Sequence, residues 1–263
     1  MTLKDTWNPQ QYERFKKERE LPFRELLALI RPQAAMRVVD LGCGTGELTR
    51  SLHRALQAKQ TVGLDSSEAM LERSAAFVEP GLRFEQADLQ QLSGHGQYDL
   101  VFSHAALQWV PDHPTLLRVI HAALAPGGQL AVQLPANQDF PSHTVAEEIA
   151  AEAPFRQALL GPSPHQGVLT PEGYSVALHQ AGFGRQHVRL QVFAHLLDSR
   201  EEVVEWVKGT LLTDYQRRLP AGLFDAFLTR YRERLLPALD SARPYLYPFK
   251  RLLLWAEKGE GLP

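Results

Sequence analysis

From Arg37 onward, the sequence alternates short apolar runs of β-strand type with segments of helical periodicity. The helical segments repeat apolar residues every three or four positions, as in Leu48, Leu52 and Leu56. Alternation of this kind is typical of βα units that build a parallel sheet. The expected strands cover residues 37–41, 60–64, 82–86, 98–103 and 129–134.

The regular alternation stops after residue 134. Residues 135–170 contain five prolines and predict a long connection with one helical piece near 145–151. Regularity then returns, with a helix over 171–181, a strand over 187–196, a helical stretch over 199–239 and a final strand over 249–256.

These patterns predict an α/β fold, a seven-stranded, mostly parallel, doubly wound (Rossmann-like) sheet whose last strand is antiparallel. An N-terminal helical arm over 1–32 precedes the sheet. The α/β core is expected over 33–198 and 245–258, with a helical lid inserted between the last two strands over 199–244.

Composition narrows the classes of partner. The 263 residues carry 28 Lys and Arg against 30 Asp and Glu, without the basic excess that binding to a phosphate backbone requires. We therefore expect no binding to nucleic acid. No signal-peptide core and no apolar stretch of membrane-spanning length is present, so we expect a cytoplasmic protein that does not bind a membrane. We also expect a monomer or a dimer. Cys43 is the only cysteine, and the histidines show no ligand spacing, so no metal site is expected.

The first strand runs into a glycine-rich loop, Gly42-Cys43-Gly44-Thr45-Gly46, that precedes a helix. Such a loop lies at the carboxyl edge of a parallel sheet, where doubly wound proteins bind ligands, and glycines let the main chain approach a ligand closely. A dinucleotide fingerprint would carry its third glycine at position 47, where this chain has Glu47. A carboxylate there suits the helix dipole but repels a pyrophosphate, so a ligand with a positive sulfonium and no phosphate fits better.

Two more carboxylates follow the next two strands. Asp65 ends the second strand, at about the interval at which such folds present a carboxylate to ribose hydroxyls. Asp88 follows the third strand and is placed to accept a hydrogen bond from an adenine amine. Each has an alternative role as a helix N-cap or a solvated turn residue, but their succession on consecutive strand ends favours an adenosyl ligand.

The loop, Asp65, Asp88 and the turn Leu124-Ala125-Pro126-Gly127-Gly128 together resemble the class I S-adenosylmethionine-dependent methyltransferases. The resemblance implies that Asp40 and the loop glycines hold the methionine end of the cofactor, that Asp65 holds the ribose and that Asp88 holds the adenine. Met70 would pack on the adenine ring, and Tyr12 and Arg19 would close over the site. The residues expected to bind the cofactor are Tyr12, Arg19, Asp40, Gly42, Gly44, Gly46, Asp65, Ser66, Met70, Asp88, Leu89 and Ser103.

More narrowly, segments along nearly the whole chain are similar to the trans-aconitate 2-methyltransferase family. They are Trp7-Asn8-Pro9 with Tyr12, Glu18-Arg19, the stretch from Leu107 to His113, the stretch from Leu130 to Pro135, and Phe249 to Leu252. This similarity implies methylation of a carboxylate of a small organic acid to a methyl ester. One departure concerns the acceptor, because relatives usually carry Asn directly after the fourth strand and this chain carries His104.

Three alternatives stay open at the level of sequence. A methyltransferase that acts on a carrier-bound acid, of the malonyl-acyl-carrier-protein type, shares the Leu107-Gln108-Trp109 feature. The acceptor of the second alternative is a hydroxyl or an amine of a small molecule. The third is a module that binds S-adenosylmethionine without transferring its methyl group, although the lid over 199–244 favours an enzyme that excludes water.

The acceptor decides which side chains are needed for catalysis. A carboxylate is already ionised near neutral pH, so alignment and cationic groups suffice, and no general base is expected. For a hydroxyl or amine, His104 is the natural base. The candidates for gripping an acid are Arg251 and Arg19 as bidentate donors, Tyr245 and Tyr247 as hydroxyl donors, and Trp109 as a wall of the pocket. The structural alternatives are a surface arginine, a packed tyrosine and a core tryptophan.

Overall fold

The computed structural model describes residues 17–89, 92, 94, 96–159 and 167–259, with the backbone alone described for residues 17–19. The described chain divides into two compact units. A sheet unit contains Arg19–Pro135, Gly167–Gln191 and residues 251–259. A helical unit contains residues 136–159 and Val192–Lys250.

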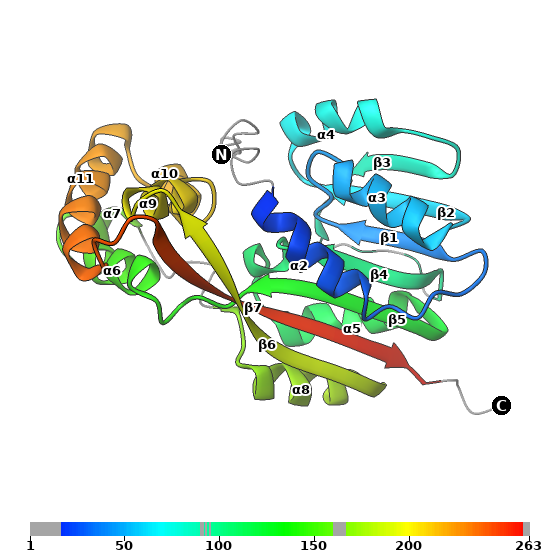
Figure 1. Ribbon diagram of the computed structural model, residues 1–263. Coiled ribbons are helices and arrows are strands. Elements are labelled where there is room, and N and C mark those ends of the chain that lie inside the picture. The colour runs from blue at the N-terminus through cyan, green and yellow to red at the C-terminus, as the bar shows by residue number, and fades with distance from the viewer. Residues whose placement is uncertain (1–16, 90–91, 93, 95, 160–166, 260–263) are drawn as a thin grey trace. The chain divides into compact units, whose positions relative to one another are not determined.

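Seven strands form one sheet in the order β3-β2-β1-β4-β5-β7-β6 (Figure 1). Strands β1 to β5 pair in parallel, and β7 runs antiparallel to β5. Their bounds are β1 Arg37–Leu41, β2 Gln60–Asp65, β3 Leu82–Gln86, β4 Tyr98–His104, β5 Leu124–Pro135, β6 Phe183–Leu197 and β7 Tyr245–Lys258. The predicted mostly parallel, doubly wound sheet with an antiparallel last strand is confirmed, and its strand order reverses between β1 and β4, where such sheets bind ligands.

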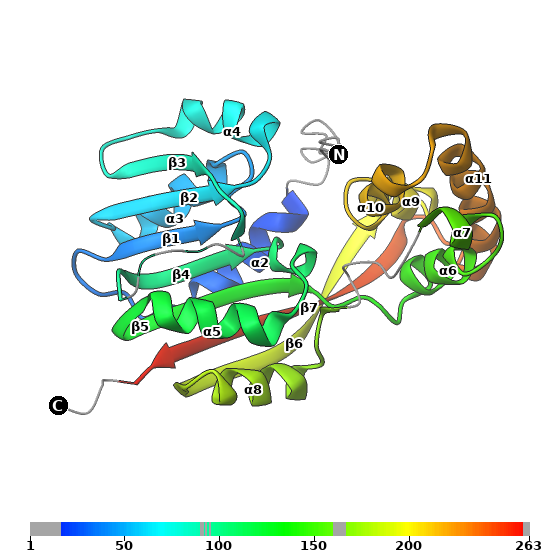
Figure 2. The same ribbon diagram turned by 180° about the vertical axis from the view of Figure 1, so that it is seen from behind.

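Helices cover both faces of the sheet unit. Figures 1 and 2, drawn from opposite sides, show α2 and α3 on one face and α5 and α8 on the other. Four of five residues in β1 are buried, because a central strand covered on both faces has no solvent-facing side. The helices of this unit are α2 Lys17–Leu27, α3 Glu47–Leu56, α4 Glu68–Ser74, α5 His113–Ala123 and α8 Pro171–Gln180, with short 3-10 turns η1 Ala75–Phe77 and η3 Leu107–Trp109.

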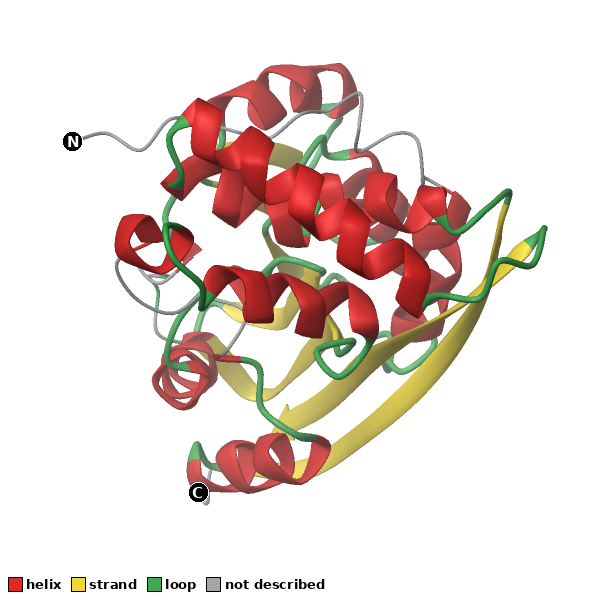
Figure 3. Cartoon of the chain, turned by 90° about the vertical axis from the view of Figure 1, so that its left-hand side faces the viewer, coloured by secondary structure: helices red, strands yellow, loops and turns green. Residues whose placement is uncertain are grey.

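The helical unit has an apolar core of its own, and its helices are among those drawn in red in Figure 3. Its helices are α6 Pro141–Ala150, α7 Phe155–Leu159, α9 Glu201–Lys208, α10 Leu211–Arg218 and α11 Ala221–Ala238. The predicted lid began at residue 199, yet α6 and α7 belong to the same unit as α9 to α11. Packing explains this difference, because Val145 and Ile149 are buried in the shared core and the rings of Phe155 and Phe227 lie 5.3 Å apart.

Arginines on the helical unit form ion pairs within it. Arg217 and Arg218 bind Asp214, whose side chain is fully buried, while Arg230 and Arg234 bind Glu152. These ion pairs give the arginines of α10 and α11 a structural role within the helical unit. None of the helices in the described part of the chain is long and apolar enough to cross a membrane.

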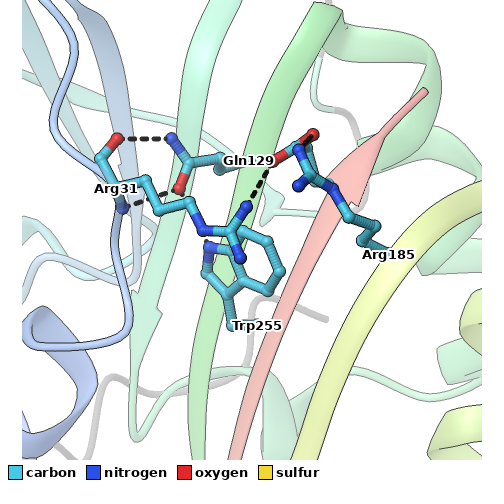
Figure 4. A network of polar contacts seen from close by, with 5 residues as sticks. Arg31, Gln129, Arg185 and Trp255 are labelled. Atoms are coloured by element: carbon cyan, nitrogen blue, oxygen red, sulfur yellow. Dashed lines mark hydrogen bonds and ion pairs between the residues drawn. The ribbon is translucent and has the colours of Figure 1, made fainter. Parts of the chain in front are cut away.

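The segment that follows α2 is fastened to the sheet by Gln129 of β5 (Figure 4). Oε1 of Gln129 accepts hydrogen bonds from the backbone N–H of Arg31 and from the indole N–H of Trp255, both at 2.9 Å, and its Nε2 donates to the carbonyl of Arg31 at 2.8 Å. The Arg31 guanidinium lies 4.5 Å from the centre of the Trp255 ring, and Glu257 binds both Arg31 and Arg185. A cavity of about 720 Å³ opens beside these side chains.

Candidate functional site

The glycine loop between β1 and α3 is shaped by contacts with the protein itself. The N–H groups of Gly42 and Cys43 both donate to the carbonyl of Leu64, which ties the loop to the end of β2. Gly42 has φ +79°, and a Cβ there would lie 2.1 Å from Cβ of Ala106. A Cβ on Gly46, at φ +81°, would lie 2.7 Å from the Phe84 ring. Both positions therefore require glycine for packing as well as for backbone conformation.

Gly44 differs from the other two loop glycines. Its φ is +56°, but a Cβ there would meet no atom within 4 Å. Its N–H donates to Oδ2 of Asp65 at 2.8 Å. The middle of the loop thus faces open space, as expected of the part that a ligand approaches.

Asp40 is a buried carboxylate, and one of its two oxygens has no hydrogen-bond donor among the described residues. Its side chain ends β1 and is 4% exposed, and its Oδ2 accepts a 2.6 Å hydrogen bond from Thr49 of α3. No described residue donates to its Oδ1. Burial raises the pKa of Asp40 to about 7, with the Thr49 hydrogen bond opposing the shift and nearby Asp65 adding to it. A cation with N–H donors, such as the ammonium of a methionine moiety, would satisfy this oxygen and favour the ionised form.

Asp65 connects the loop to the next strand ends. Its second oxygen, Oδ1, accepts from the N–H of Ser67 at 2.9 Å, and its carbonyl accepts from Ala87 at 3.0 Å. A carboxylate oxygen can accept more than one hydrogen bond. Ser67 also caps α4 by accepting from Met70, whose side chain is buried.

The other predicted cofactor residues line the same edge with different exposure. Ser66 and Asp88 are exposed, while Leu89 is half-buried and lies 3.7 Å from the position of a Cβ on Gly42. Ser103 is fully buried and donates to the carbonyl of Leu41 at 2.7 Å, which joins β4 to β1. Tyr12 lies outside the described residues, and Arg19 is described only as part of the α2 backbone.

At the end of β4, the chain turns sharply. His104 is 7% exposed, and its ring lies edge to face with Phe23 of α2, with centroids 5.9 Å apart. Ala105 follows with φ +56°, a conformation that residues other than glycine rarely adopt. Such backbone strain is frequent at functional sites, and here it redirects the chain into η3, which carries the half-buried Trp109.

His113, at the start of α5, contacts η3 through its imidazole ring. No role was predicted for it from the sequence. Its Nε2 bonds the carbonyl of Leu107 at 3.0 Å, and its Nδ1 bonds the hydroxyl of Tyr174. Burial lowers the pKa of His113, which keeps the ring neutral at physiological pH. Its role is to hold η3 in place.

The residues predicted to grip the substrate belong to different units. Arg251 is in the sheet unit, 4% exposed, with Nη1 3.4 Å from Oε1 of Gln133. Tyr245 and Tyr247 belong to the helical unit, where both are core residues and the Tyr247 hydroxyl contacts Ser142 at 3.2 Å. Sequence patterns did not single out Thr49 or Gln133, because the sequence around a polar residue in a helix or strand does not indicate which group its side chain will bond in the folded protein.

The described residues contain no group of three His, Cys, Asp or Glu side chains arranged to hold a metal ion. The site instead offers the Asp40 carboxylate near the end of β1, whose Oδ1 accepts from no described residue, the Asp65 carboxylate at the end of β2 and an open loop between them. These groups fit an adenosyl cofactor that carries an ammonium, which is the ligand expected from the sequence.

Comparisons with known proteins show the family of the chain. Residues 12–188 match a family model described as a methyltransferase domain. The chain is 43% identical over 264 residues to a trans-aconitate 2-methyltransferase of Deinococcus radiodurans, with 97% of this chain and 99% of that protein covered. It is 40% identical over 248 residues to the protein of the same name from Variovorax paradoxus, with 94% of each chain covered.

A solved structure, that of the YcgJ protein from Bacillus subtilis, has the same fold. It superposes with a TM-score of 0.62 at 15% identity, covering 92% of this chain and all of that one. Fold and sequence similarity agree, and the chain belongs to the methyltransferase domain family as an S-adenosylmethionine-dependent enzyme.

Proposed function

We propose that this enzyme methylates a carboxylate of a small polycarboxylic acid, trans-aconitate or a close analogue, and produces a methyl ester. The observation that carries the proposal is the similarity over nearly the full length to proteins named for this activity, at 43% and 40% identity. It extends beyond the cofactor-binding half to the end of the chain, where Arg251 lies. A buried arginine at the carboxyl edge of the sheet supplies the cationic donor that an acid requires.

The residues at the edge of the sheet have separate tasks in this reaction. S-adenosylmethionine, when bound, supplies a methyl group activated by a positively charged sulfur. Asp40 and the loop around Gly44 would hold its methionine end, and Asp65 its ribose. Arg251 would bind and orient the acid, so that one of its carboxylates faces the methyl group in line with the bond to sulfur.

Orientation suffices for such a reaction because the nucleophile needs no activation. A carboxylic acid is ionised near neutral pH, so the attacking oxygen already carries negative charge. Holding two reactants in a near-attack arrangement supplies a large part of the rate enhancement. His104, at the end of β4, then acts by packing and shape rather than by moving a proton.

A panel of acceptors tests the proposal. Initial rates of methyl transfer are measured with trans-aconitate, with its cis isomer, with dicarboxylates and with small alcohols and amines. We expect the highest kcat/KM for trans-aconitate or a close polycarboxylate. Turnover of an alcohol or an amine with no turnover of any acid would refute the proposed acceptor and leave the enzyme class intact.

A further inference from the structure

Three polar side chains lie on one face of three neighbouring strands. His104 of β4 is in register with Gln133 of β5. Gln133 is opposite Leu253 of β7, so Arg251, two residues away along β7, is its diagonal neighbour on the same face. His104, Gln133 and Arg251 are 7%, 0% and 4% exposed. They therefore form a buried polar row near the carboxyl ends of β4 and β5.

The contact with Arg251 fixes the orientation of the Gln133 amide. Nη1 of Arg251 lies 3.4 Å from Oε1 of Gln133. Because a guanidinium only donates hydrogen bonds, the amide must turn its oxygen toward Arg251 and its NH₂ group away. That Nε2 is buried and donates to none of the residues that the structure describes. A buried amide donor without an acceptor is unfavourable and uncommon, so it marks a place for a ligand oxygen.

Gln129 provides an internal comparison. It lies on the same strand and the same face, four residues earlier, and it is also 0% exposed. Both ends of its amide are bonded, to Arg31 and to Trp255. The amide of Gln129, a buried glutamine with a purely structural role on β5, thus forms hydrogen bonds to protein groups at both its oxygen and its nitrogen. The Nε2 of Gln133, by contrast, donates to none of the described residues.

We propose that Gln133 is a substrate-binding residue for a polycarboxylic acid, an inference that rests on the function proposed above. Its Nε2 donates to one carboxylate of the acid, and its Oε1 orients Arg251 toward the same group. The bound carboxylate is one that does not receive the methyl group, because two donors draw electron density from its oxygens and weaken it as a nucleophile. The pair therefore selects acids that carry a further carboxylate beyond the one that reacts.

Steady-state kinetics of Gln133→Met and Gln133→Glu test this assignment. The acceptors are trans-aconitate and two dicarboxylates that keep the carboxylate that reacts and each lack one of the other two. Gln133→Met should raise KM for trans-aconitate by about tenfold or more, as expected for loss of a hydrogen bond to a charged group. Its kcat and its Kd for S-adenosylmethionine should change by less than about threefold. For the dicarboxylate that lacks the bound group, KM should be equal in wild type and variant.

Gln133→Glu keeps the shape of the side chain, so it carries the test if the methionine variant folds poorly. Its added charge repels the acid and should raise KM further. Gln129→Met is the matched control, with KM for trans-aconitate as in the wild type. An unchanged KM in Gln133→Met, or an equal rise for all three acids, would overturn the role of Gln133. If the wild type methylates none of these acids, the proposed function itself fails first.

Discussion

Oγ1 of Thr49 donates a 2.6 Å hydrogen bond to Oδ2 of Asp40, while Oδ1 of the same buried carboxylate accepts from none of the residues that the structure describes. This pair joins β1 to α3 across the glycine loop. Because burial raises the pKa of Asp40 to about 7, the charge of this group changes within the physiological range.

Cofactor binding should depend on pH through Asp40. The ionised form attracts the ammonium of the cofactor, so Kd should rise by about eightfold between pH 7.5 and pH 6, as a pKa near 7 requires. Titration calorimetry with S-adenosylmethionine at several pH values measures this. Asp40→Asn should bind about tenfold more weakly at pH 7.5 and lose the dependence; an equally steep dependence in the variant would show that another group is responsible.

The same substitution should stabilise the protein in the absence of cofactor. The pKa of Asp40 is higher in the folded chain than its ordinary value of 3.8, so the folded state binds more protons and loses stability as pH rises from about 4 to 7. Asn removes this loss. We expect Asp40→Asn to unfold at higher urea concentration than the wild type at pH 8, with a smaller difference at pH 5.

The loop glycines should differ in their effect on stability. Gly42→Ala combines a left-handed φ with a clash against Ala106, so it should cost about 2–4 kcal/mol of the free energy of unfolding. Gly44→Ala meets only the backbone strain and should cost about 1–2 kcal/mol. Urea unfolding of both variants measures the difference, and equal losses would contradict the packing role assigned to Gly42.

Two substitutions in the network of Figure 4 compare how much buried and exposed contacts contribute to the free energy of unfolding. Gln129→Leu leaves the indole N–H of Trp255 and both backbone groups of Arg31 without their partner, so it should cost about 2–4 kcal/mol. Arg185→Ala removes only an ion pair whose arginine is 63% exposed, so its cost should stay below about 1 kcal/mol. A larger loss for Arg185→Ala than for Gln129→Leu would contradict this view of the network.

His104→Asn tests whether a general base takes part. With an ionised carboxylate as acceptor, kcat should fall by less than about tenfold. A fall of more than about a hundredfold, with S-adenosylmethionine binding unchanged, would indicate that His104 removes a proton and that the acceptor is a hydroxyl or an amine. The pH profile of kcat provides a second readout, because a base adds a limb on the acidic side.

Most of the sheet follows from the sequence because its strands carry strong local signals. The apolar run before Gly42 and the helix that begins at Glu47 were predicted from the residues, and the structure confirms both. The helical piece expected near 145–151 is part of α6, but the start of α6 and the whole of α7 were not predicted, because Pro141 and Pro154 suggest loop structure. The apolar partner of Phe155 in α7 is Phe227, which lies about 70 residues further along the chain.

The candidate site was only partly predictable for a related reason. Asp40 and Asp65 are signalled by their place at the carboxyl ends of apolar strands. The bond from Thr49 depends on how α3 packs on β1, and that of Gln133 depends on the register of β5 with β7. Tyr245 and Tyr247 looked like pocket residues in sequence, but alternation along β7 places them in the core of the helical unit. Their role in substrate binding stays a prediction, as do the closing of Tyr12 and Arg19 over the cofactor and the binding of the acid by Arg19.

The most direct test follows the methyl group itself. The purified protein is incubated with S-adenosylmethionine labelled in its methyl group and with trans-aconitate, and the product is treated with mild base. The account predicts a labelled monomethyl ester that releases its label as methanol, in an amount equal to the S-adenosylhomocysteine formed. Label that resists base, or transfer only to a hydroxyl or amine acceptor, would contradict carboxylate methylation by this enzyme.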